Sequence, residues 1–278
     1  MLPLFRLLSL LPLRLLHAAG ALLGWVVFLS SPVYRRRFRE NARQAGLRFA
    51  QVRGAVAHTG RMAAELPRLW LGAMPAVEWA DAACSDAAYA RGTGVLFLTP
   101  HLGCFESTAV ALAQRYGPVH GPLTVLFRPA RKAWLAPLVA ASRQKPGMEA
   151  VPTTLAGVRQ MIRALRQKRA VGLLPDQVPP EGMGLWVPFF GKPAYTMTLA
   201  ARLVHQTGAH PLLVWGERLP AGRGFRLHCR ELREPLSGDL ETAVTQLNEE
   251  MARLILECPQ QYLWSYARYK TPRAQAAG

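Results

Sequence analysis

The chain has 278 residues, half of them apolar, which is enough for one sizeable core with a small appendage and argues against two full domains. Its 34 lysine and arginine residues exceed its 17 aspartate and glutamate residues and give a formal net charge of +17, so we expect anionic partners such as nucleic acid, acidic lipid or phosphorylated substrate. The four cysteines form no CxxC pair and no zinc-ligand spacing, which argues against a disulfide framework and favours a reducing compartment.

The first 33 residues are almost entirely apolar, interrupted only by Arg6, Arg14 and His17, and contain no carboxylate. The run from Leu15 to Val33 is close to the roughly 20 apolar residues that span a bilayer. We therefore predict a membrane anchor over residues 1–33, either as one span or as a hairpin in the membrane plane. A cleaved signal peptide fits less well because the apolar run continues, and the remaining alternative is a buried helix pair of a soluble protein.

A basic segment, YRRRFR at residues 34–39, follows the anchor. Positive charge after a span favours the cytoplasmic side for the rest of the chain, so we expect a catalytic domain over residues 34–278 on that side. The anchor also weakens the nucleic-acid interpretation, because the sequence shows no zinc finger and no basic-aromatic pattern of an RNA-binding sheet.

Helical and strand-like patterns alternate in the rest of the chain, which is the signature of an α/β fold. Residues 40–90 have a helical pattern, and residues 155–166 place apolar side chains at three- and four-residue spacing. A strand pair closed by the turn AGRG and a final helix at about residues 239–257 complete the domain. Four short apolar runs predict further strands at residues 94–100, 122–129, 170–175 and 211–216.

Three ionisable residues, His101, Arg128 and Asp176, come at or just after the ends of three of these runs. In an open α/β sheet the ligand crevice lies beyond the carboxyl ends of the strands, so we expect the three side chains to converge at one edge.

His101 is followed by Glu106, with Gly103 between them, and the spacing alone is a weak signal. If His101 ends a strand and Gly103 opens a helix, a carboxylate from the first turn of the helix can bind one ring nitrogen, leaving the other as a general base. Cys104 and Ser107 are the nearby candidates for a covalent nucleophile, but no elbow motif marks either. A metal site that combines His101 and Cys104 with His205 or His210 has loose spacing and is a weaker alternative.

Five segments carry a resemblance to a known family. The stretches HLGCFE, FRP, LLPDQ, VPFFGKPAYT and CPQQYLWSYARYK, in this order, resemble the lauroyl/myristoyl acyltransferases of lipid A biosynthesis, which belong to the glycerolipid acyltransferase superfamily. The likeness runs over most of the chain. It implies an α/β fold with a central mixed sheet flanked by helices and an N-terminal membrane-anchoring helix.

The resemblance also implies roles for single residues. His101 is expected to be the general base and Glu106 its orienting carboxylate, while Arg128 and Arg143 bind substrate oxygens. Asp176 and Gln177 are expected to shape the acceptor side.

The implied reaction transfers an acyl chain from an acyl carrier protein thioester to a hydroxyl of a phosphorylated glycolipid, a Kdo2-lipid IVA type precursor of lipid A, at the bacterial inner membrane. It needs no cofactor and no metal, and no nucleic acid takes part. Two alternatives stay open. The first is the same chemistry on a lysophospholipid or a phosphatidylinositol mannoside, and the second is a non-catalytic basic protein that docks acidic partners at the membrane.

Two further segments have open roles. Tyr266 stands where related sequences have a histidine, so the WSYARYK segment has no assigned function; its simplest interpretation is a closing strand with Tyr262 and Trp264 in the core. The aromatic residues Trp186, Phe189 and Phe190 are expected either to wall an acyl chain, to dip into the membrane interface or to pack in the core.

Overall fold

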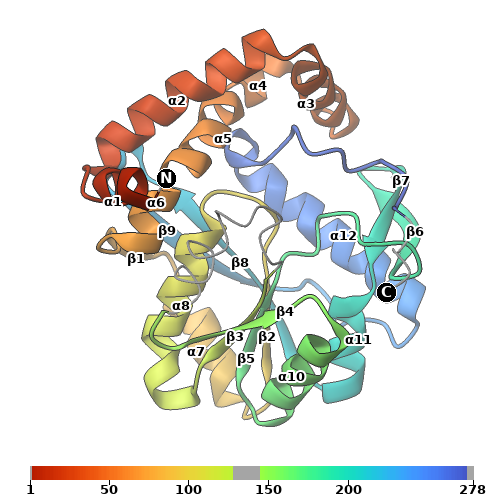
Figure 1. Ribbon diagram of the computed structural model, residues 1–278. Helices are drawn as coiled ribbons and strands as arrows, with labels where there is room; N and C mark the ends of the chain where they lie inside the picture. Colours follow the sequence, from red (N-terminus) through yellow and green to blue (C-terminus); the bar gives the residue numbers. More distant parts are fainter. Residues whose placement is uncertain (1, 128–144, 274–278) are drawn as a thin grey trace.

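The centre of the described part of the molecule is a mixed sheet of seven strands (Figure 1). The computed structural model describes residues 2–127 and 145–273. The strand order is β1-β9-β8-β2-β5-β3-β4; β9 is antiparallel to β8 and the other neighbours are parallel. The predicted mixed α/β sheet is thereby confirmed. The strands are β1 (Val77–Trp79), β2 (Val95–Leu98), β3 (Leu123–Phe127), β4 (Met148–Pro152), β5 (Ala170–Leu173), β8 (His210–Arg218) and β9 (Phe225–Glu231).

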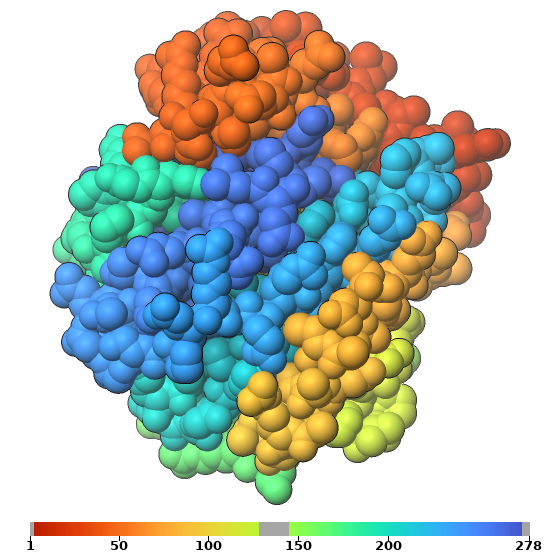
Figure 2. All heavy atoms as spheres, turned by 180° about the vertical axis from the view of Figure 1, so that it is seen from behind, coloured from red at the N-terminus to blue at the C-terminus, as the bar shows by residue number. Residues whose placement is uncertain are grey.

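Helices cover both faces of this sheet. Successive side chains of a strand point to opposite faces, and in the central strands both sets are apolar and buried. In β2, Val95 and Phe97 belong to a core cluster with residues of α7 (Ala82–Ala90) and α8 (Phe105–His120). Leu96 and Leu98 belong to the larger cluster, with α10 (Leu155–Arg166), α11 (Leu199–Thr207) and α12 (Leu240–Glu257). Figure 2 shows the face opposite to that of Figure 1, where α7 lies beside β9.

The predicted elements match this architecture closely. The four apolar runs correspond to β2, β3, β5 and β8, and the predicted strand pair is β8 and β9. The expected helix at residues 155–166 is α10, capped by the Thr154 hydroxyl, which accepts a hydrogen bond from the Gly157 N–H. The final helix is α12, capped in the same way by the Asp239 carboxylate.

Six helices precede β1 in the described part of the chain. The helical pattern predicted for residues 40–90 is confirmed for the end of α3 and for α4 to α7, but the range also contains the strand β1. They are α1 (Leu2–Ser9), α2 (Leu13–Ser30), α3 (Pro32–Gln44), α4 (Phe49–Val52), α5 (Gly54–Ala64) and α6 (Leu66–Leu71). In Figure 1, α2 runs along the upper edge of the molecule with α5 beneath it, and the two helices pack against each other. The apolar N-terminal segment is thus in contact with the body of the protein.

A second, two-stranded sheet consists of β6 (Gly184–Phe189) and β7 (Lys192–Met197), which form an antiparallel hairpin. Two short 3-10 helices, η2 (Pro220–Gly222) and η3 (Pro259–Gln261), lie in the C-terminal half. The expected closing strand after η3 is wrong: residues 262–273 form turns and irregular backbone, with one isolated bridge between Tyr262 and Leu102. The predicted burial of Tyr262 and Trp264 in the core is confirmed.

Candidate active site

The loop after β2 positions His101 at the carboxyl end of that strand. Gly103 has a φ of +59°, and a Cβ there would lie 2.0 Å from the Gly216 carbonyl oxygen, so this turn requires glycine. The Cys104 N–H donates to the same oxygen at 2.7 Å, which ties the loop to β8. Cys104 then caps α8, so the histidine lies just before the helix, as its sequence context predicts.

Asp176 holds His101 at two points. The Nδ1 atom of His101 lies 2.7 Å from Oδ1 of Asp176, and the His101 backbone N–H donates to Oδ2 at 2.9 Å. Asp176 follows β5, and β5 pairs directly with β2, so the two residues come from the ends of neighbouring parallel strands. The predicted convergence of these two side chains is confirmed.

The hydrogen bonds of the imidazole define its chemistry. An ionised Asp176 accepts a hydrogen bond from His101 Nδ1–H, so the proton of the neutral imidazole is on Nδ1 and a lone pair is on Nε2. The Gln177 side-chain nitrogen lies 3.0 Å from that Nε2 and can donate to it. The result is an oriented imidazole whose Nε2 is a proton acceptor.

The surroundings favour the charged form of Asp176. Burial alone would raise the pKa of this carboxyl, but the adjacent imidazole, the two hydrogen bonds from His101 and the charge of Arg268 outweigh burial and lower the pKa. Arg268 is itself buried, and its Nη1 donates to the Tyr195 carbonyl oxygen at 2.7 Å. An ionised Asp176 stabilises a positive charge on His101.

Asp176 takes the orienting position that the sequence assigns to Glu106. The physical reason is the sheet order, which places the end of β5 directly beside the end of β2, while Glu106 belongs to the first turn of α8. Glu106 is buried and lines the same cavity as His101. It interacts electrostatically with Lys145.

The two candidate nucleophiles are buried and occupied with local contacts. Cys104 is only 1% exposed, and burial raises the pKa of its thiol well above the ordinary value. Its sulfur accepts a hydrogen bond from the Ser107 N–H, and the Ser107 hydroxyl donates to the Cys104 carbonyl oxygen at 2.9 Å. These features describe a helix cap, whereas a reactive cysteine needs a lowered pKa and access to solvent.

The histidines considered for a metal site have other partners. His205 contacts the Ser237 carbonyl oxygen at 2.8 Å, and His210 contacts the Glu231 carboxylate at 2.7 Å. Neither contact involves His101 or Cys104, so the geometry does not support that alternative.

An apolar cavity of about 340 Å³ is lined by His101, by residues of α8 and by residues of the central sheet. Its size is at the lower end of the roughly 300–1,000 Å³ typical of small-molecule sites. The polar groups on its wall include His101, Glu106 and Gln177. The apolar lining includes Phe97, Phe105, Ala109, Leu112, Leu123, Val125, Leu126, Phe127, Leu173 and Val214.

A second, basic pocket of about 750 Å³ lies between α3, the β6–β7 hairpin and the C-terminal segment. Its lining includes the cations Arg36, Arg37, Arg43, Lys192, Arg268 and Lys270, together with one acid, Glu40. We call it the basic pocket.

A short chain of contacts joins the basic pocket to the loop that carries Asp176 and Gln177. The Asn41 side-chain amide donates to the Trp264 and Tyr266 carbonyl oxygens at 2.6 and 2.7 Å. The Tyr266 hydroxyl accepts from the Val178 N–H at 2.9 Å, one residue after Gln177. The WSYARYK segment therefore supports the loop that carries Asp176 and Gln177.

The remaining predicted residues fall into two groups. Arg128 and Arg143 lie outside the described residues. Phe189 is buried and Phe190 partly buried, and they pack in the core near Trp264, whereas Trp186 is half exposed. The core interpretation is therefore confirmed for the two phenylalanines.

Sequence reasoning missed the contributions of Arg268 and Asn41. Both make contacts with residues distant in the chain, Arg268 with Tyr195 and Asn41 with Trp264. The one signal that could have found Arg268 is its position in the WSYARYK segment, which the family resemblance already marks.

The chain is similar in sequence to known proteins. The family model for bacterial lipid A biosynthesis acyltransferases matches residues 2–271, so the chain belongs to that family. It is 31% identical over 117 residues to the lipid A biosynthesis lauroyltransferase of Escherichia coli K12. This aligned region covers 41% of this chain and 38% of the relative. It is 29% identical over 115 residues to the lipid A biosynthesis palmitoleoyltransferase of the same organism, again over 41% and 38% of the two chains. The aligned part thus spans about two fifths of the length of these curated relatives.

Proposed function

We propose that the protein transfers a fatty acyl chain from an acyl carrier protein thioester to a hydroxyl of a lipid A precursor of the Kdo2-lipid IVA type. The observation that carries this proposal is the Nε2 of His101, a proton acceptor held by Asp176 at the wall of an apolar cavity. Membership in the lipid A acyltransferase family supports the substrate class.

The transfer is direct. The acceptor hydroxyl gives its proton to Nε2 of His101 as its oxygen attacks the thioester carbonyl carbon. The tetrahedral intermediate then expels the thiolate, which takes the proton back from the imidazolium, so that an ester and a free thiol result. The Gln177 amide now occupies the hydrogen-bonding position at Nε2 that the hydroxyl would take, so it marks the acceptor side.

Four further residues complete the proposed site. Glu106 places a carboxylate in the wall of the cavity, where its negative charge favours the imidazolium formed during transfer. Arg128 and Arg143 remain proposed ligands for substrate oxygens, a task that suits the guanidinium fork. Asp176 orients and stabilises His101, and we propose no covalent enzyme intermediate.

The two pockets suit the two halves of the reaction. The apolar cavity takes the acyl chain, and the basic pocket, with six cations and one acid in its lining, takes the acidic headgroup of the acceptor. The Asn41–Tyr266–Val178 contacts connect the two regions. The net charge of +17 also favours the acidic acyl carrier protein, and we place the reaction on the cytoplasmic side of the inner membrane.

The test is a product analysis. Membranes that contain the protein are incubated with a mixture of acyl carrier protein thioesters and a tetra-acylated lipid A precursor, and mass spectrometry reads the product. A gain of one acyl chain that disappears with His101→Ala supports donor, acceptor and base together. Transfer to a lysophospholipid or a mannosylated phosphoinositide instead would refute the acceptor and keep the chemistry, and no transfer to any hydroxyl would support the docking alternative.

A further inference from the structure

The sequence leaves open whether the apolar N-terminal segment spans the membrane or lies in its plane, and the packing of α2 decides between the two. The buried residues of α2 recur on one side along its whole length: Leu13, Leu16, His17, Gly20, Gly24 and Phe28. This side faces α5 and the helices next to it. A Cβ at Gly24 would lie 2.2 Å from the Val56 carbonyl oxygen, and a Cβ at Gly60 would lie 1.9 Å from that of Gly20. The two backbones are therefore in direct contact.

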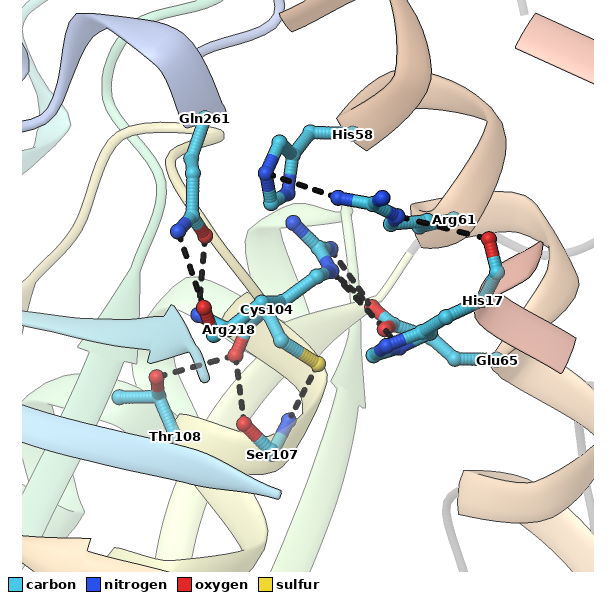
Figure 3. A network of polar contacts seen from close by, with 9 residues as sticks. All are labelled: His17, His58, Arg61, Glu65, Cys104, Ser107, Thr108, Arg218 and Gln261. Atoms are coloured by element: carbon cyan, nitrogen blue, oxygen red, sulfur yellow. Dashed lines mark hydrogen bonds and ion pairs between the residues drawn. The ribbon is translucent and has the colours of Figure 1, made fainter. Parts of the chain in front are cut away.

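A buried ion network fixes the same face of α2 to the sheet (Figure 3). The His17 Nε2 lies 2.9 Å from the Glu65 carboxylate, and the Arg218 guanidinium binds the same carboxylate with distances of 2.6–3.1 Å. Glu65 and Arg218 side chains are each 1% exposed. The charge of Arg218 and the contact with His17 overcome the effect of burial and lower the pKa of Glu65, so this carboxylate is ionised. Removing α2 would take away the His17 contact and expose the Glu65–Arg218 ion pair.

The helix that α2 covers is unsuited to the interior of a bilayer. Arg61 of α5 donates to the His17 carbonyl oxygen and to the Nε2 of His58. Arg61 and His58 thereby belong to the same network as His17 (Figure 3). With 18 residues, α2 is about 27 Å long, against a hydrocarbon thickness of about 30 Å. If α2 crossed the membrane in this structure, it would carry Arg61 and the ion network into the hydrocarbon, which is costly for charged groups.

The opposite side of α1 and α2 is exposed and apolar. The exposed large apolar side chains of α1, α2 and the turn between them are Leu4, Leu7, Leu10, Leu15, Leu22, Leu23, Val26, Val27 and Leu29. Arg6 and Arg14 lie in the same two helices, the arginines of α3 follow, and the first carboxylate of the chain is Glu40. An apolar face whose charged neighbours in the sequence, up to Arg39, are all cations is complementary to an anionic lipid surface.

We propose that α1 and α2 lie in the plane of the membrane, with this apolar face inserted at the lipid boundary and the rest of the protein on one side. The protein then attaches to one leaflet, and α2 does not cross the bilayer. The active site and the basic pocket stay in water beside the same leaflet, where a lipid acceptor presents its headgroup. This inference concerns topology and holds whatever lipid the enzyme acylates.

Topology is tested on the full chain with a protease-cleavable tag at each end. In inverted inner-membrane vesicles, we expect the added protease to remove both tags to the same extent without detergent. Spheroplasts should protect both tags. Removal of the N-terminal tag in spheroplasts and its protection in inverted vesicles would show that α2 spans the membrane and would overturn the proposal.

Insertion of the apolar face is tested with the purified protein and vesicles of phosphatidylethanolamine and phosphatidylglycerol in a 3:1 ratio. We expect Leu22→Asp combined with Val26→Asp to weaken sedimentation with the vesicles at least about tenfold. Val119→Asp is the matched control, since Val119 is exposed at the far end of α8, and it should bind as wild type does. Equal binding of the double variant, or a wild-type protein that stays in solution as a dimer, would refute the insertion. Neither readout depends on acyl transfer.

Discussion

His101 and Asp176 are 75 residues apart in the sequence and 2.7 Å apart in the structure, at the ends of the adjacent parallel strands β2 and β5. The carboxylate accepts one hydrogen bond from the imidazole and one from the His101 backbone, so it fixes both the ring and the loop that carries it. The pair is therefore organised in the absence of substrate, which in the proposed reaction keeps the cost of forming the imidazolium low.

Asp176→Asn tests this pair. The amide keeps the size of the side chain but removes the negative charge and no longer fixes the tautomer of His101. We expect kcat to fall by about 10³–10⁴, as in hydrolase triads that lose their aspartate. Asp86→Asn, on the exposed side of α7, should leave kcat unchanged. An Asp176→Asn enzyme within about fivefold of wild-type kcat would contradict the assigned role.

Gly172 tests the apolar cavity as the site of the acyl chain. This residue of β5 lines the cavity, and a Cβ added there would meet Val125 at 3.4 Å, which is ordinary contact. Gly172→Ala should therefore fold and narrow the cavity. We expect the ratio of long-chain to short-chain transfer to fall about tenfold in a competition between donor thioesters, a difference typical of one or two methylenes. Gly238→Ala, which meets open space, is the control, and an unchanged ratio would place the chain elsewhere.

The basic pocket is tested by removing charges from its rim. Arg37→Gln and Lys270→Gln should each raise the KM for a bisphosphorylated acceptor about fivefold at low salt, because each cation near an anionic group contributes about 1 kcal/mol. The effect should shrink in 0.5 M salt, and kcat should change little. Arg159→Gln on α10 is the matched control. Equal KM values for the pocket and control variants would remove this pocket from the acceptor site.

His58 gives a prediction for stability against pH. Burial, with the charges of Arg218 and Arg61, lowers the pKa of His58 to about 3, whereas an unfolded histidine titrates near 6.5. The unfolded chain thus binds a proton in this interval that the folded chain does not. Stability from this residue is complete above about pH 6.5 and falls as the pH drops, by roughly 1.4 kcal/mol per pH unit at most.

The measurement is urea unfolding in mild detergent at pH 7 and pH 5. His58→Gln should show a smaller loss of stability between the two values than wild type, by about 1–2 kcal/mol. His205→Gln, on the exposed part of α11, should behave as wild type does. Parallel pH profiles for wild type and His58→Gln would contradict the predicted sign.

The strand pattern of this protein could be predicted because each strand in the sheet centre is a short apolar run that ends at proline, glycine or a charge. The sequence does not predict which carboxylate binds the imidazole of His101. Glu106 is close in the sequence, whereas Asp176 becomes the partner only because β5 lies next to β2, and strand order is a property of the whole sheet. The sequence does not predict β1, β4, β6 and β7, since these strands are short or mixed in polarity, and β1 lies inside a range with a helical pattern.

The N-terminal helix shows a different limit. A run such as ALLGWVVFLS satisfies the composition of a membrane span, and so does a helix that buries one side on protein and the other in lipid. The distinguishing residues are Gly20 and Gly24, whose role appears only when α5 is placed against them. Similarly, Arg268 and Asn41 act through contacts with distant residues.

The rate of acyl transfer by His101→Ala, measured beside Cys104→Ser under single-turnover conditions, tests the central claim most directly. We predict that His101→Ala loses at least about 10³-fold in rate and keeps its thermal unfolding midpoint, whereas Cys104→Ser transfers at nearly the wild-type rate, because serine replaces cysteine as the cap of α8. A His101→Ala enzyme within tenfold of wild type, or an acyl chain trapped on Cys104 together with an inactive Cys104→Ser variant, would contradict direct transfer by a histidine base.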